Sequence, residues 1–180
     1  MNERNMLENL AAKGVLLLFG RITPEKHEVL ARQLLGLECE ERTDIVTLRI
    51  DSGGGDAFVG LRLSDAIRFA PFPVHGVVTG RACSAAFLVL QNCDRRIAWP
   101  NARLVFHPGT CTVQIDSEDG ESTYRRGKEL WERSLGELSQ KSGKDIETLR
   151  RWGRDDREFS ADEALKLGFI DEILQPPKKE

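Results

Sequence analysis

In the first half of the chain, two patterns of apolar and polar positions occur in turn, one typical of strands and one typical of helices. Short apolar runs that stop at polar or glycine-rich turns predict strands, and longer segments with apolar residues three or four apart predict helices. The expected strands are Val15–Ile22, Asp44–Ile50 and Val74–Thr79; the expected helices run from Thr23 to about Arg42, over Phe58–Phe69 and over Ser84–Leu90. This order of strands and helices predicts an α/β fold with a parallel sheet and crossover helices.

The pattern changes in the second half of the chain. Two shorter β segments are expected at Arg96–Trp99 and Arg103–Phe106, followed by a strand at Thr112–Ile115, a polar turn at Asp116–Gly120 and helices at Glu121–Lys141 and Asp145–Trp152. A capping box opens a helix at Ser160, Gly168 ends it, and Phe169–Leu174 is the last expected strand. The charged helix Glu121–Lys141 carries few large apolar residues, so we expect it to project or to pack on another subunit.

Composition narrows the class of protein. The chain has 180 residues, of which 40% are hydrophobic and 31% charged, with a net charge of -3. These values predict one soluble globular domain and give no electrostatic case for nucleic-acid binding. The apolar run at 15–19 is too short to cross a bilayer, so no membrane span is expected. We expect residues 175–180 to form a disordered tail.

Cysteine usage points to a reducing compartment. Cys39, Cys83, Cys93 and Cys111 have neither CxxC spacing nor histidine partners at zinc-site intervals. We therefore expect free thiols, no metal, no cofactor and a cytoplasmic location.

Three polar residues carry the chemistry that the sequence suggests. Ser84 follows a predicted buried strand and opens a helix, His107 closes a second apolar run before Pro108, and Asp156 precedes a helix start. In the order Ser, His, Asp these residue types can supply a nucleophile, a base and an orienting acid. The glycines at 53–55 follow a strand, where backbone N–H groups can approach a reacting carbonyl.

Each residue also has a plainer interpretation when taken alone. Ser84 could cap a buried helix, and the glycine run could be a simple turn, although it lacks the lysine of a phosphate-binding loop. Asp156 has acidic neighbours at Asp155, Glu158 and Asp162, among which sequence logic alone does not choose.

Four separated motifs together resemble the Clp protease proteolytic subunit family. They are Ile50–Gly55 (IDSGGG), Gly80–Ala85 (GRACSA), Pro100–His107 (PNARLVFH) and the stretch from Asp156 to Asp171. Their order and approximate spacing hold from Val15 to Leu174, which is far more specific than any one motif.

The resemblance implies a ClpP/crotonase-like fold and a serine endopeptidase. It assigns the nucleophile to Ser84, the base to His107 and the orienting acid to Asp156, with the backbone N–H groups of Gly55 and Ala85 as the oxyanion hole. It further implies that Gly53, Gly54, Pro108 and Gly109 bind a peptide or unfolded-protein substrate.

The family also implies an organisation and an assembly. Residues 1–180 form one domain, with a head at about 15–110 and 150–174 and a strand-and-helix handle at about 111–149. The expected assembly is a homo-oligomer of heptameric rings, single or stacked in pairs.

The chain departs from the family pattern in places. Gly53 replaces a proline, and the Ser84–His107 interval and Pro108 are closer to the outlying translocation-enhancing group. Thr47 and Arg49 stand where typical members have aromatic residues in the cleft that docks an ATP-dependent unfoldase, which argues against such a partner.

Three rival functions use the same fold or the same residues. The first is a scaffold or peptide-binding ring with a silent triad. The second is a crotonase-type acyl-CoA enzyme, which would not need the Ser, His and Asp set. The third is a Ser-Lys peptidase with Lys128, Lys141 or Lys144 as base, which His107 makes unnecessary.

Overall fold

The computed structural model describes residues 2–108 and 118–176. The chain divides into two compact units: unit 1 is Met1–Val105 with Glu158–Glu180, and unit 2 is Phe106–Arg157. Unit 2 contains the expected handle together with His107 and Asp156, which the sequence analysis grouped with the head.

Unit 1 is built on one largely parallel sheet. In the described part of the chain its seven strands are β1 (Val15–Phe19), β2 (Val46–Ser52), β3 (Val74–Cys83), β4 (Arg95–Ala98), β5 (Arg103–Val105), β6 (Glu158–Ser160) and β7 (Glu172–Ile173). The order is β1-β2-β3-β4-β7, and β5 pairs with β3 and with β6. Only the β5–β6 pair is antiparallel among these pairings. The α/β fold class with a mainly parallel sheet is therefore confirmed.

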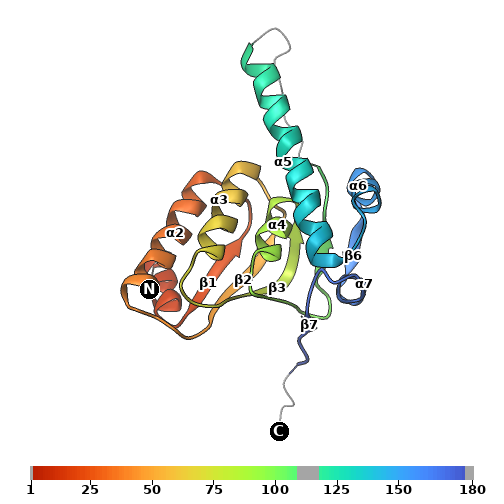
Figure 1. The fold of residues 1–180 in the computed structure, drawn as a ribbon. Helices are drawn as coiled ribbons and strands as arrows, with labels where there is room; N and C mark the ends of the chain where they lie inside the picture. The colour runs from red at the N-terminus through yellow and green to blue at the C-terminus, as the bar shows by residue number, and fades with distance from the viewer. Residues whose placement is uncertain (1, 109–117, 177–180) are drawn as a thin grey trace. The chain divides into compact units, whose positions relative to one another are not determined.

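Five helices accompany this sheet in unit 1: α1 (Glu3–Ala12), α2 (Pro24–Cys39), α3 (Ala57–Arg68), α4 (Ala85–Gln91) and α7 (Ala161–Lys166). Figure 1 shows α2, α3 and α4 side by side along one face of the strands β1–β3. Local sequence explains their starts, since the Thr23 and Asp56 side chains accept from backbone N–H groups in the first turns of α2 and α3. A capping box joins Ser160 and Glu163 at α7.

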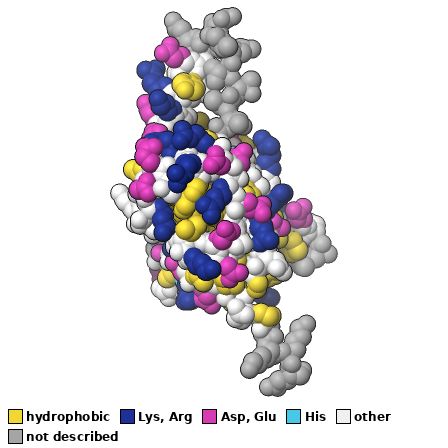
Figure 2. All heavy atoms as spheres, turned by 90° about the vertical axis from the view of Figure 1, so that its right-hand side faces the viewer, with side chains coloured by type: hydrophobic (Ala, Val, Ile, Leu, Met, Phe, Trp, Pro, Cys, Tyr) yellow, Lys and Arg dark blue, Asp and Glu magenta, His cyan; other side chains and the backbone are white. Residues whose placement is uncertain are grey.

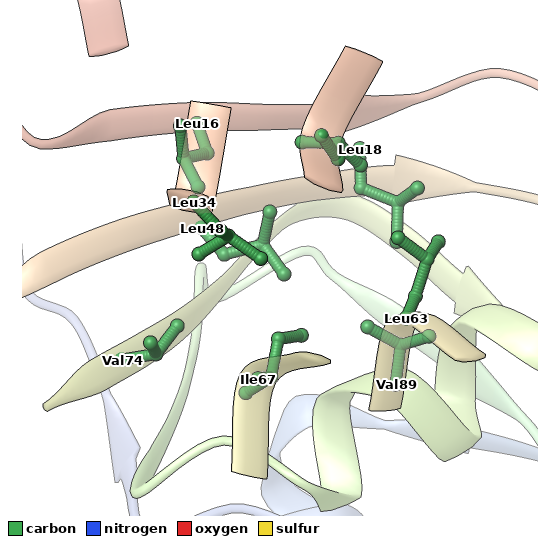
Figure 3. Close-up of a pocket in the computed structure, with 9 residues that line it drawn as sticks. Leu16, Leu18, Leu34, Leu48, Leu63, Ile67, Val74 and Val89 are labelled. Atoms are coloured by element: carbon green, nitrogen blue, oxygen red, sulfur yellow. The ribbon is translucent and has the colours of Figure 1, made fainter. Parts of the chain in front are cut away.

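The core of unit 1 lies between the sheet and these helices. Inward positions of β1–β3 alternate with outward ones, as the buried residues Leu16, Leu48 and Val74 show. Figure 3 shows leucine, isoleucine and valine side chains from strands and helices converging on a cavity of about 10 Å³. A space of this size holds about one water and its lining is apolar, so it is a packing defect and not a substrate site.

Unit 2 consists of two helices in the described residues, α5 (Glu118–Ser142) and α6 (Ile146–Arg154), with the segment 106–108. Asp145 caps α6 by accepting the Thr148 N–H. In this unit the rings of Phe106 and Trp131 stack with centroids 4.8 Å apart.

Element boundaries differ from the sequence expectations at informative places. Strand β3 continues past its expected end at Thr79 to Cys83, because its end pairs with β5. Strand β1 stops at Phe19, and Ile22 forms an isolated bridge with Gly55. Helix α1 and strand β6 were not expected, and residues 118–120 of the expected polar turn are helical. The strand expected at 112–115 lies outside the described residues.

The surface carries both signs of charge. Figure 2 shows Lys and Arg side chains interspersed with Asp and Glu over the visible face. Within the described residues, none of the helices combines the length and the apolar character needed to span a bilayer.

Candidate active site

Ser84 occupies a sharp strand-to-helix turn in unit 1. Strand β3 pairs with β4 along His75–Val78 and then with β5 along Arg81–Cys83, so its carboxyl end is held between β2 and β5. Ser84 follows at φ +54° and ψ -124°, a conformation that a residue with a Cβ rarely adopts. Backbone strain of this kind clusters at functional sites.

The Ser84 hydroxyl is not used as a helix cap. Ser84 occupies the N-cap position of α4, yet its side chain makes no capping hydrogen bond. The position of the backbone is fixed instead by the Ser84 N–H, which donates to the Val105 carbonyl at 2.9 Å. The plainer interpretation of Ser84 as a capping serine is therefore wrong for its side chain.

Helix α4 directly behind Ser84 is firmly anchored. Phe87 and Phe169 meet edge to face with centroids 5.3 Å apart, and Phe169 meets Phe159 in the same way at 5.2 Å. The first N–H groups of a helix have no intrahelical acceptor, so Ala85 presents its N–H beside the Ser84 side chain. This N–H is available to a developing negative charge.

The glycine turn packs against the same place. A Cβ on Gly54 would lie 2.7 Å from the Ser84 Cβ and 2.6 Å from the Cys83 carbonyl oxygen, and Gly54 has φ +88°. Only glycine permits this approach. A Cβ on Gly55 would lie 2.3 Å from the Ile22 carbonyl oxygen. The bridge to Ile22 uses the Gly54 carbonyl and the Asp56 N–H, which leaves the Gly55 N–H out of the pairing.

Ser52 holds this turn in place. Its buried hydroxyl donates to the Gly20 carbonyl at 2.6 Å and accepts the Gly54 N–H at 3.0 Å. Sequence reasoning missed this role. The signal was present, since Ser52 occupies an inward position of the alternation that begins Val46, Leu48, Ile50.

Gly53 is different from its two neighbours. A Cβ there would make only ordinary contacts, the nearest being 3.6 Å from the guanidinium carbon of Arg81. Gly53 is exposed, so the space around it is open on one side.

His107 and Asp156 form a pair within unit 2. His107 Nδ1 lies 3.0 Å from Asp156 Oδ1, with 30% of the His107 side chain and 74% of the Asp156 side chain exposed. The structure thereby selects Asp156 from the acidic residues around it as the neighbour of this imidazole. With Nδ1 engaged by a carboxylate, Nε2 is left to accept a proton.

Asp156 reaches His107 from an unusual backbone position. Helix α6 ends in a Schellman motif, in which the Arg157 N–H donates to the Trp152 carbonyl at 3.2 Å and the Asp156 N–H to the Gly153 carbonyl at 3.3 Å. The motif requires a left-handed residue, and Asp156 adopts φ +47° where glycine is usual. A side chain retained at such a cost indicates a role for that side chain.

Cys83 is the thiol nearest in sequence to this turn. Burial raises the pKa of its thiol, which outweighs the opposing charge of Arg81. A protonated thiol is a poor nucleophile. Within the described residues, Cys39, Cys83 and Cys93 form no disulfide.

The predicted site residues thus fall into two groups. Unit 1 holds Ser84, Ala85 and the glycines at 53–55, and unit 2 holds His107, Asp156 and the half-buried Pro108. Gly109, which was expected to bind substrate, lies outside the described residues. Across the described part of the chain, His, Cys, Asp and Glu side chains form no cluster of three that could hold a metal ion.

Comparison with known families agrees with the sequence resemblance. The family model described as Clp protease matches residues 2–177, which is nearly the whole chain. The mixed α/β architecture with its mainly parallel sheet is consistent with the fold of this family. On this match, the chain belongs to the Clp protease family of peptidases.

Proposed function

We propose that this chain is a serine endopeptidase that uses Ser84 as nucleophile, His107 as general base and Asp156 as orienting acid. The observation that carries the proposal is the 3.0 Å pair between His107 Nδ1 and Asp156 Oδ1. These two residues lie far apart in the sequence, and the triad logic requires this pairing and this ring nitrogen.

The reaction follows from the roles of these groups. His107 Nε2 takes the proton of the Ser84 hydroxyl as its oxygen attacks a peptide carbonyl, and Asp156 stabilises the imidazolium that forms. The N–H groups of Gly55 and Ala85 stabilise the tetrahedral oxyanion. His107 then gives its proton to the leaving amine, and water hydrolyses the acyl-enzyme by the same route.

The proposal requires the Ser84 hydroxyl to meet the His107 imidazole. Chain connectivity supports this meeting, because the Ser84 N–H donates to Val105 and His107 follows two residues later. The free hydroxyl of Ser84 and the strained turn that presents it are further support.

The proposed substrate class rests on the family match and on the glycine turn, of which Gly53 is exposed. An extended peptide or unfolded segment would add as a strand along the glycine turn and the segment after His107, using main-chain hydrogen bonds. We propose that the chain works in a homo-oligomeric ring and cleaves short peptides without an ATP-dependent unfoldase. A cytoplasmic location, expected from the free thiols, is part of this proposal.

The first test is labelling with a fluorophosphonate probe, with the labelled residue mapped by mass spectrometry. We expect labelling of Ser84 in the wild type and none in Ser84→Ala. His107→Ala should slow labelling by several orders of magnitude, because the hydroxyl loses its base. The wild type should hydrolyse fluorogenic peptides without added nucleotide, and Ser84→Ala and His107→Ala should lose this activity.

Other outcomes identify the rivals. No labelling of Ser84 in an assembled, folded protein would contradict the proposal and favour a scaffold with a silent triad. Thioester turnover that survives Ser84→Ala would indicate a crotonase-type acyl-CoA enzyme, since that chemistry needs only the paired N–H groups.

A further inference from the structure

Three residues of unit 2 form a tight aromatic wedge, which we define as Phe106, Trp131 and Gly153. The Phe106 and Trp131 rings stack with an interplanar angle of 23° and centroids 4.8 Å apart. A Cβ on Gly153 would lie 2.5 Å from the Cη2 atom of Trp131 and 3.4 Å from a ring carbon of Phe106. The stacked rings of Phe106 and Trp131 therefore both pack against Gly153 of helix α6.

Each end of the wedge is next to one member of the His–Asp pair. Phe106 directly precedes His107 and is 2% exposed, so its ring anchors that segment. The Gly153 carbonyl accepts the Asp156 N–H at 3.3 Å, which ties the wedge to the left-handed residue that carries the carboxylate.

The glycine itself points to the importance of the indole. Glycine inside a helix destabilises it by about 1 kcal/mol relative to alanine. Gly153 has an ordinary helical backbone, so conformation alone does not require glycine there. The requirement comes from Trp131, whose ring fills the space that a Cβ would occupy.

The position of the exposed Asp156 carboxylate depends on the packing of the backbone that carries it. With 74% of the Asp156 side chain exposed, its position follows largely from where the backbone places it. The His107 side chain is less exposed, at 30%, and Pro108, which directly follows it, restricts the His107 backbone. A small shift of either backbone segment would lengthen the 3.0 Å contact between Nδ1 and Oδ1.

We propose that Trp131 is a positioning residue, which sets the separation of His107 and Asp156 by fixing the Phe106 ring against Gly153. This role rests on the proposed function for its effect on catalysis, but its geometric part can be tested separately. It makes helix α5 part of the catalytic framework, although Trp131 itself touches neither substrate nor the reacting atoms.

The variants follow from the contacts. Trp131→Leu removes the stack and leaves room beside Gly153, and Trp131→Phe keeps an aromatic ring. Tyr124→Leu is the matched control, because Tyr124 lies on the same helix and is 61% exposed. Gly153→Ala inserts the Cβ against the indole, and the Gly153→Ala/Trp131→Leu double variant relieves that clash.

Two readouts are needed. Steady-state peptide hydrolysis gives kcat and KM separately, and crystal structures of each variant give the Nδ1–Oδ1 distance without reference to activity. We expect Trp131→Leu to lower kcat roughly 10- to 100-fold with KM within about twofold, since misplacement near 1 Å has effects of this size. The distance should exceed about 3.5 Å, beyond hydrogen-bonding range.

The remaining variants separate positioning from a general packing role. Trp131→Phe should recover most of the lost kcat, and Tyr124→Leu should match the wild type. Gly153→Ala should resemble Trp131→Leu, and the double variant should be more active than Gly153→Ala alone, which is non-additive behaviour expected of coupled neighbours.

An unchanged His107–Asp156 distance in Trp131→Leu would overturn the positioning role, whether or not the protein is a peptidase. Equal losses in Trp131→Leu and Tyr124→Leu would overturn it as well. If the Nδ1–Oδ1 distance lengthens in Trp131→Leu but Ser84 is not labelled in the wild type, only the proposed function is contradicted and the positioning role stands.

Discussion

Replacing Asp156 by glycine should have opposite effects on stability and on activity. Asp156 holds φ +47° at the end of α6, a position where glycine is favoured because it lacks a Cβ. A non-glycine residue in this conformation costs about 1–2 kcal/mol, and Asp lies at the low end because it tolerates the left-handed region. Asp156→Gly should therefore gain about 0.5–1 kcal/mol from backbone relaxation.

The lost contact with His107 offsets part of this gain. The pair is largely exposed on the Asp156 side, and exposed pairs are worth about 0.2–1 kcal/mol. The net free energy of unfolding should stay within about 1 kcal/mol of the wild type, on the stabilised side or near zero. Peptidase kcat should fall roughly 10³- to 10⁴-fold, because the imidazole loses the group that fixes its tautomer.

The assay combines urea unfolding at fixed protein concentration with peptide hydrolysis. Asp156→Asn is the matched control, since asparagine also tolerates the left-handed conformation but carries no charge. It should lose activity to a similar degree with little change in stability. Destabilisation of Asp156→Gly by more than about 1.5 kcal/mol would refute the backbone argument, and activity within tenfold of the wild type would refute the role of the carboxylate.

Three further predictions concern unit 1. Gly54→Ala should abolish fluorophosphonate labelling and destabilise the protein by about 2 kcal/mol or more, because its Cβ would meet the serine turn at 2.6–2.7 Å at positive φ. Gly53→Ala is the control, because its Cβ would have contacts no closer than 3.6 Å, and it should leave labelling and stability unchanged. Equal effects of the two substitutions would contradict the role of Gly54. Burial raises the pKa of Asp171, but hydrogen bonds from Arg96 more than reverse it and leave that pKa below its usual value. Its stabilisation is therefore fully present above about pH 4 and is lost as pH falls through the lowered pKa. Asp171→Asn should cost about 1–2 kcal/mol in urea at pH 7, and the difference from the wild type should shrink as pH falls below about 4. A difference that stays constant over this range would contradict the linkage. Cys83→Ser should retain peptidase activity, because partial burial raises the pKa of this thiol and keeps it protonated. Loss of peptide hydrolysis in this variant would contradict that.

The sequence by itself determined the order of strands β1–β3 and helices α2–α4, and it supplied the candidate serine, histidine and aspartate. Alternating apolar positions placed the three main strands and the helices between them, because periods of two and 3.6 are local properties. Local signals also located the starts of α2 and α7, where Thr23 and Ser160 cap the first turns. The separated motifs were sufficient to indicate the family.

Tertiary structure alone decided the boundaries and the partners. The extension of β3 to Cys83 depends on pairing with β5, which follows much later in the chain. Strand β6 forms only because β5 pairs with it. A local pattern contains neither partner, so the strand end expected at Thr79 was wrong.

The roles of single side chains depended on folding in the same way. Sequence alone did not distinguish Asp156 from its acidic neighbours as the partner of the histidine. In the fold, Asp156 Oδ1 lies 3.0 Å from His107 Nδ1. It also shows that the Ser84 hydroxyl is free of capping and that Trp131 fills the space beside Gly153. Periodicity can assign a residue to a face of its own element, but a contact between distant segments is fixed by packing, which only the folded chain supplies.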